Sequence, residues 1–300
     1  MDLFAPLPRE GTEAEALGAA PVSYWGDVWR RFRQNRLAMT GLVIIGLLVV
    51  MAAVGPHLSG HAFDAQNLSM VNRPPSREYW FGTDALGRDL FTRVWCGARI
   101  SLLIGVSTAV LSFLIGVTYG GISGYIGGRV DEIMMRLVEV LSSIPFLLWV
   151  ILLMVLMEPG LQAIMIALAA TTWLTMARIV RGQVLALKEQ EYVLAARVLG
   201  AGALRILARH LVPNTMGPII VTMTLMIPEN IFTEAWLSFL GLGVPPPNTS
   251  WGSLASEGIQ GLRNYPWQLF FPAFFISVTM LAFNFVGDGL RDALDPRLRK

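Results

Sequence analysis

The residues of this chain that could do chemistry are few, and the most telling of them lie beside a long apolar run. Glu229, Asn230 and Glu234 follow the apolar stretch that begins at Leu211. A carboxylate at mid-bilayer costs about 2.5 to 3.5 kcal/mol on insertion scales, so it faces protein, water or the membrane surface. Two interpretations stay open. These residues line a solute path that favours a cationic group, or the glutamates mark the outer end of a helix and pair with arginine.

Catalytic and nucleotide-binding motifs are missing from the sequence. The two lysines, Lys188 and Lys300, do not follow a glycine, so there is no phosphate-binding loop of the GxxxxGK[ST] type. The chain also lacks HExxH and a nucleophile elbow. Cys96 is the single cysteine, which excludes an internal disulfide and a CxxC motif. We therefore expect no enzymatic activity and no cofactor bound by this chain; any ATP would be bound by another subunit.

One cluster has a spacing that could reach a metal ion. His57, His61 and Asp64 stand three to four residues apart. Pro56 and Gly60 interrupt the helix that would align them, so an ordinary solvated loop is the favoured interpretation.

The composition indicates a membrane protein. Hydrophobic residues make up 54% of the 300 residues, charged residues only 15%, and the mean hydropathy is +0.56. Too few charges are available to cover a water-soluble globule. The net charge of +2 does not favour nucleic acid as a partner.

The apolar residues fall into six blocks of membrane-spanning length, so we predict an all-α membrane protein with six transmembrane helices. The blocks are Leu37–Pro56, Ile100–Gly128, Val140–Met157, Leu161–Ala177, Leu211–Pro228 (continuing toward Leu240) and Pro266–Gly287. Gly116, Gly120 and Gly124 form a row of small residues that predicts close helix packing. Pro145 and Pro228 are expected to kink or break their helices.

Basic residues predict the orientation. With the N-terminus inside, 17 of the 23 lysines and arginines fall in inside segments. This excess favours cytoplasmic N- and C-termini. Residues 1–36 are expected to be a cytoplasmic tail with an interfacial helix, because Tyr24, Trp25, Val28, Trp29 and Phe32 share one helical face. A plain juxtamembrane anchor is the alternative for the same stretch.

The long inside loop, residues 178–212, is too long for a simple connector. We predict one helix from Lys188 to Leu199, closed near Gly200, and a second from Ala203 to Leu211, stopped by Pro213. Its alanines offer a smooth surface for a partner groove, although a solvated amphipathic loop fits the composition equally well.

The motif in this loop resembles a known family. The stretch EYVLAARVLGAGALRILARHLVPN is similar to the cytoplasmic signature of ABC importer permeases, which reads EAA, three residues, Gly, nine residues and I-x-L-P. The residues that fit this spacing are Ala195, Ala196, Gly200 and Pro213. Leu194, His210 and Val212 depart from the general signature but agree with its oligopeptide and dipeptide permease branch.

Three more stretches resemble that branch, in the same order along the chain. They are FGTDALGRD (Phe81–Asp89), SFLGLG (Ser238–Gly243) and LAFNFVGDGLRDALDPR (Leu281–Arg297). Together the resemblance covers nearly everything from Trp25 to Lys300, and it is to the second, C-type permease subunit.

The resemblance implies a type I ABC importer permease fold in a bacterial inner membrane. It implies a homologous permease, two ATPase subunits that bind ATP and Mg, an extracytoplasmic solute-binding protein, and a peptide as cargo. The ATPases would receive a coupling loop made of Glu191, Tyr192, Ala195, Ala196, Arg197, Gly200 and Ala201. Nickel, glutathione or another small solute are alternative cargoes for the same machine.

The resemblance also implies a division of the chain. We expect residues 37–98 to hold the first transmembrane helix and an extracytoplasmic loop, 99–288 an ABC transmembrane type-1 domain, and 289–300 a cytoplasmic tail. The competing functional class is an ion-coupled secondary transporter, which would need ionisable residues at the midplane and internal repeats. Spans two, four and six lack charges in their central runs, and no clear repeat is seen. An intramembrane enzyme is disfavoured by the missing motifs.

Overall fold

The computed structural model describes residues 23–295, so the expected tail before Ser23 and the last five residues lie outside the described part. Within that part the regular structure is helical. The helices are α1 (Tyr24–Gln34), α2 (Arg36–Val54), α3 (Leu90–Ile126), α4 (Gly128–Ser143), α5 (Phe146–Met157), α6 (Leu161–Leu187), α7 (Glu191–Val198), α8 (Ala203–Ile206), α9 (Val212–Phe239), α10 (Trp251–Ile259) and α11 (Trp267–Leu294). Short 3₁₀ turns at Gly55–His57 (η1) and Leu68–Met70 (η2) and a π-helical turn at Leu207–Leu211 (η3) complete the set.

Five helical segments are long and apolar enough to cross a membrane, and a sixth span exists if α4 and α5 are counted as one broken span. The break is an 83° bend between them. Pro145 lies there, and its missing N–H and its ring prevent a continuous helix. The predicted break at Pro145 is therefore confirmed, and it divides the expected span Val140–Met157. Its first residues belong to α4, and α5 alone has 12 residues, too few to cross a bilayer.

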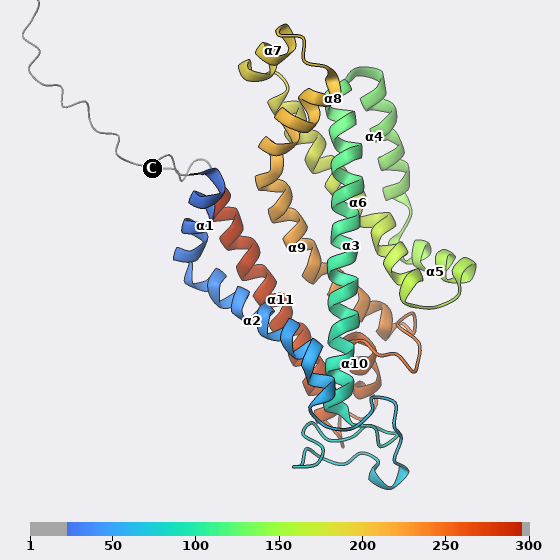
Figure 1. Cartoon of the computed structure of the whole chain (residues 1–300). Coiled ribbons are helices and arrows are strands. Elements are labelled where there is room, and N and C mark those ends of the chain that lie inside the picture. Colours follow the sequence, from blue (N-terminus) through green and yellow to red (C-terminus); the bar gives the residue numbers. More distant parts are fainter. Residues whose placement is uncertain (1–22, 296–300) are drawn as a thin grey trace, which may run out of the picture.

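The long helix α3 forms the centre of the bundle, with α6 and α9 packed along it (Figure 1). It begins at Leu90, ten residues before the expected start. The Asp89 side chain accepts a hydrogen bond from the backbone N–H of Thr92 and so caps the first turn.

The glycine row on α3 packs against α6, which confirms the predicted close approach. A Cβ at Gly120 would lie 2.2 Å from the carbonyl oxygen of Ala177, and one at Gly124 would lie 2.9 Å from the carbonyl oxygen of Arg181. At Gly116 the nearest atoms belong to the flexible side chain of Met176. At Gly120 the backbone of α3 therefore contacts the backbone of α6 directly, and no flexible side chain lies between them that could move to accommodate a Cβ.

Replacing Gly120 by alanine is expected to destabilise the protein by about 1 to 3 kcal/mol, because the added methyl overpacks the α3–α6 contact. Gly182 on α6 is the matched control, since a Cβ there meets nothing within 4 Å. Gly182→Ala should be neutral or stabilising by about 0.5 to 1 kcal/mol. Thermal unfolding of the two purified variants in detergent measures the difference. Equal midpoints would contradict the packing argument.

The segment that leads into α9 differs from the prediction. Helix α8, the π-turn η3 and α9 form one continuous span, Ala203–Phe239, so Pro213 does not stop a helix. Instead, the backbone N–H of Val212 reaches back five residues to the carbonyl of Leu207, and Pro213 falls in the first turn of α9. A proline is tolerated there because its missing N–H is not needed. Pro228 also lies inside α9, which continues to Phe239 without a break.

Helix α1 is amphipathic, as predicted, and docks through one part of its apolar face. Val28 and Phe32 are buried in a cluster that includes Val286 and Leu294 of α11. The aromatic side chains of Tyr24, Trp25 and Trp29 stay exposed.

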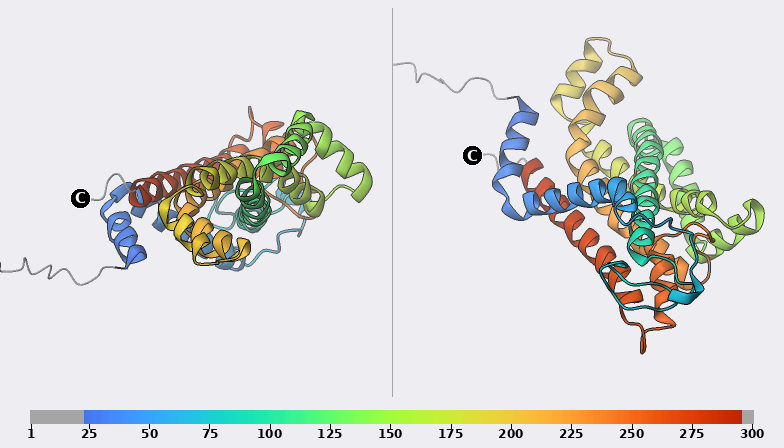
Figure 2. Two further views of the ribbon diagram at one scale, coloured as in Figure 1. Left: turned by 90° about the horizontal axis from the view of Figure 1, so that it is seen from above. Right: turned by 60° about the horizontal axis from the view of Figure 1, so that its bottom comes forward.

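The two ends of the bundle are distinct. Helices α1 and α7 and the last turns of α11 lie at one end, and α10 lies with residues 58–89 at the other (Figures 1 and 2). We refer to these as the α7 end and the α10 end. The predicted loop 178–212 thus projects from the same end that carries α1.

Candidate functional site: a projecting loop, a threonine-lined cavity and a buried charge network

Helix α7 is anchored by one side chain and otherwise projects from the bundle. Val193 is fully buried, and it belongs to the same core cluster as Val184, Ile206 and Leu211. The helix begins at Glu191 rather than at the predicted Lys188, whose Nζ donates to the carbonyl of Gly124. Gly200 has a φ of +83°, in the left-handed region, so its predicted role in closing the helix is confirmed.

Most of the predicted coupling residues lie on the surface of this projection. Glu191, Tyr192, Ala195, Arg197 and Gly200 are exposed. Ala196 and Ala201 are half-buried. The tyrosine hydroxyl has a raised pKa because its surroundings desolvate the charged form.

The most exposed apolar side chains of the loop were missed by the sequence motif. Val198, Leu199 and Leu204 are 88%, 87% and 79% exposed, and they flank the Gly200 turn. We call these three residues the apolar tip. Single exposed apolar residues are common on protein surfaces. Three of them close together around the turn between α7 and α8 indicate a contact surface. The available sequence signal was their position on either side of the turn formed by Gly200 and Gly202.

The base of the projection is held by an ion pair across three helices. Arg181 of α6 makes a bidentate contact with Asp131 of α4, at 2.5 and 2.6 Å, and Ser123 of α3 donates to the same carboxylate at 2.5 Å. A bidentate guanidinium–carboxylate pair fixes geometry as well as charge. The α7 end is thus tied to the long central helix.

The three predicted path residues do not lie together. Glu229 is exposed and lines a cavity of about 200 Å³ with Thr172, Thr175 and Thr222. Asn230 is buried and donates to the Thr108 hydroxyl of α3 at 2.7 Å. In the described residues neither Glu229 nor Glu234 forms an ion pair with arginine.

Glu234 is fully buried in a cluster of serines. Its Oε1 accepts from Ser238 of α9 at 2.9 Å and from Ser250, the N-cap of α10, at 2.6 Å. Ser250 also forms a capping box with Ser253. The carboxyl group therefore joins the end of α9 to the start of α10, which is a positioning role within the fold.

Replacing Ser250 by alanine removes both the helix cap and a donor to Glu234. We expect a loss of about 2 kcal/mol of stability, since a lost N-cap costs about 1 kcal/mol and a buried acceptor left with fewer partners adds about as much. Ser277→Ala is the control, because that exposed hydroxyl only donates to the carbonyl of Ala273 in its own helix. A thermal midpoint of Ser250→Ala equal to that of the control would contradict this.

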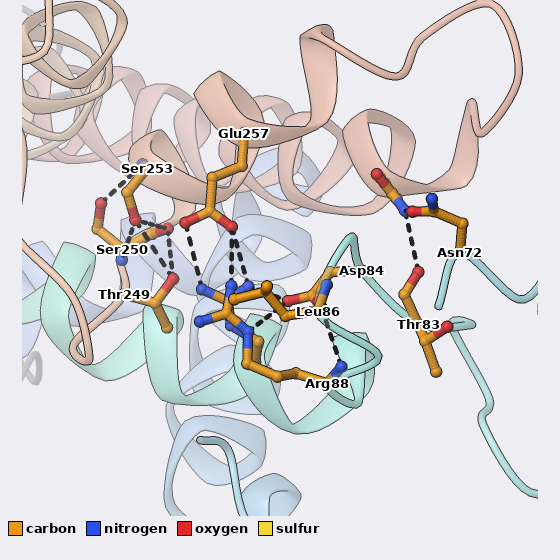
Figure 3. A network of polar contacts seen from close by, with 11 residues as sticks. Asn72, Thr83, Asp84, Leu86, Arg88, Thr249, Ser250, Ser253 and Glu257 are labelled. Carbon is orange, nitrogen blue, oxygen red and sulfur yellow. Dashed lines mark hydrogen bonds and ion pairs between the residues drawn. The ribbon is translucent and has the colours of Figure 1, made fainter. Parts of the chain in front are cut away.

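A buried charge network lies at the α10 end and includes Asp84 and Arg88 of the FGTDALGRD stretch (Figure 3). Arg88 Nε donates to Asp84 at 2.7 Å, and Arg93 contacts both Asp84 and Glu257 of α10. Arg93 is 1% exposed. The network fastens residues 81–93 to α10 and lines a cavity of about 530 Å³.

The histidine cluster shows no geometry of a metal site. The ring of His61 stacks on Tyr79, with centroids 4.8 Å apart. Within residues 23–295 no group of three or more His, Cys, Asp or Glu side chains is arranged to hold a metal ion.

Comparison with known proteins gives concordant matches along the chain. Residues 116–300 match the family "Binding-protein-dependent transport system inner membrane component", and residues 23–75 match "N-terminal TM domain of oligopeptide transport permease C". The oligopeptide transport system permease protein OppC of Bacillus subtilis is 57% identical, covering 100% of this chain and 98% of that protein. The dipeptide transport system permease protein DppC of the same organism is 58% identical over 99% of this chain and 93% of that protein.

A more distant relative and a solved structure agree. OppC of Escherichia coli is 46% identical over 95% of each chain. The inward-facing MetNI methionine ABC transporter aligns with a TM-score of 0.54 at 17% identity, over 66% of this chain and 94% of that one, which shows the shared fold. The helical architecture, the projecting loop and these full-length matches place the chain in the family of binding-protein-dependent transport system inner-membrane components, in the oligopeptide and dipeptide permease branch.

Proposed function

We propose that this chain is one of two permease subunits of an ATP-driven importer of di- or oligopeptides. We propose a peptide cargo because the chain is 57–58% identical, over essentially its full length, to permeases named for oligopeptide and dipeptide transport. A homologous permease would complete the path, and an extracytoplasmic binding protein would deliver the peptide.

In this proposal two ATPase subunits bind ATP and Mg and receive the apolar tip together with the coupling residues of α7. The α7 end then faces the cytoplasm, with both termini, and the α10 end faces the binding protein. Val193 gives the tip a rigid base because it is packed into a core cluster that extends to Trp251 of α10. A displacement imposed on α7 would therefore move packed helices rather than a loose loop, as rigid-body transitions require.

Uptake into proteoliposomes that contain the full complex tests this function. We expect import of a labelled tripeptide that requires ATP on the ATPase side and a saturating binding protein. Import driven by an ion gradient without the ATPases would instead support a secondary transporter. If unlabelled peptides did not compete with the labelled tripeptide for uptake, and nickel or glutathione did, the cargo would have to be reassigned.

A further inference from the structure

Glu229 is placed where a lipid-facing carboxylate would not be tolerated. Its neighbour Asn230 bonds to Thr108, which lies 18 residues from either end of α3. Glu229 is therefore level with the middle of the central helix. An exposed carboxylate at this depth must face water or protein, because hydrocarbon would impose a large desolvation cost.

The cavity beside Glu229 is lined by both polar and apolar side chains. Thr172 and Thr175 approach from α6 and Thr222 from α9, while Leu225 and Met226 complete the lining. In the described residues the Glu229 carboxylate has no ion-pair partner, whereas two buried acidic side chains at the two ends of the bundle, Asp84 and Asp131, are paired with arginine. The charge at mid-depth is thus left available to a ligand.

Glu234, the other candidate, already forms hydrogen bonds within the fold. Its carboxylate accepts from Ser238 and Ser250 and is fully buried between α9 and α10. It faces a different side of α9 from Glu229, because five residues turn an α-helix by about 140° beyond a full turn.

We propose that Glu229 is a specificity-determining residue of the translocation path, whose carboxylate receives the α-ammonium group of the passing peptide. This inference rests on the proposed peptide function. Thr172 donates to the carbonyl of Leu168 at 2.8 Å and Thr222 to that of Pro218 at 2.9 Å, so these hydroxyls can accept hydrogen bonds from peptide N–H groups. The Glu229 carboxylate offsets the positive charge at the free N-terminus of a peptide. The cavity of about 200 Å³ on this chain has room for one terminal group rather than for a whole peptide.

The test compares three substitutions in proteoliposomes that contain the full complex, with tri-alanine presented by a saturating binding protein. If charge matters, initial uptake falls in the order Glu, Asp, Gln, Lys. We expect Glu229→Asp to keep at least half of the rate and Glu229→Gln to lose about tenfold, equivalent to about 1.4 kcal/mol. ATP hydrolysed per imported peptide should rise correspondingly. Glu158→Gln, at an exposed site beyond the end of α5, should change neither quantity.

The outcomes separate the two proposals. If Glu229→Gln imports as well as wild type, or if uptake follows side-chain shape so that Gln is tolerated and Asp is not, the assignment of Glu229 is overturned while the peptide function stands. A wild-type complex that assembles and hydrolyses ATP but imports no peptide overturns the proposed function and this inference with it. The uptake rate of each variant is divided by the measured amount of assembled complex.

Discussion

Substituting Leu199 by aspartate is expected to lower binding-protein-stimulated ATP hydrolysis at least tenfold while the chain still inserts and folds. Leu199 is 87% exposed, so the fold loses almost no contact when it is replaced. In the assembled transporter, however, the apolar tip would lie in an ATPase groove, and a charge at the centre of such an interface costs about 2 kcal/mol or more. The measurement is ATP hydrolysis by the reconstituted complex with and without the binding protein.

Leu68 provides the matched control for this prediction. It is also a strongly exposed leucine, at 73%, but it lies with residues 58–89 at the α10 end. Leu68→Asp should leave basal ATP hydrolysis and ATPase assembly unchanged. If Leu199→Asp retained normal stimulated hydrolysis and normal ATPase assembly, the tip could not be the docking surface.

Replacing Asp84 by alanine is expected to cost about 3 to 5 kcal/mol of stability, which is the usual penalty for removing one partner of a buried ion pair. Asp84 accepts from Arg88 and Arg93, and all three side chains are buried. Among residues 23–295, the two guanidinium groups would keep Glu257 as their remaining ion-pair partner. In thermal unfolding of the purified protein in detergent we expect the midpoint to fall by about 10 °C.

Two comparisons make this second prediction specific. Glu139→Ala removes an exposed pair with Arg136 and should cost no more than about 0.5 kcal/mol. Adding Arg93→Met to Asp84→Ala should recover part of the loss, because the unpaired buried charge is then gone as well. Strict additivity of the two single substitutions would contradict a shared network.

Contacts within the fold account for several arginines in and next to the loop between the first two predicted spans. The segment predicted to be outside is rich in arginine, which runs against the excess of basic residues expected on the inside. Arg88 and Arg93 are held in the network, and Arg99 donates to the carbonyls of Ala52 and Ala53 at the end of α2, at 2.5 and 2.8 Å. These charges serve local structure, so counting them as topology signals is misleading.

The helix boundaries show where local patterns stop being sufficient. Apolar block length predicted the helical class and most spans, because a bilayer of given thickness demands about 20 such residues in any context. At α4 and α5 the predicted break at Pro145 is confirmed, but block length alone did not place the start of the first helix at Gly128. The predicted helix stop at Pro213 was wrong, since a preceding π-turn placed that proline in a first helical turn where it is harmless.

The sequence by itself determined the helical membrane class and the closing role of Gly200. The first follows from the length of the apolar blocks, and the second from the freedom of glycine to adopt a positive φ. Only the tertiary structure decided which glutamate is enclosed by serines and which lines a cavity. That choice depends on how α9 is rotated against α3, α6 and α10, and rotation is set by packing between segments more than 100 residues apart, such as Thr108 and Asn230.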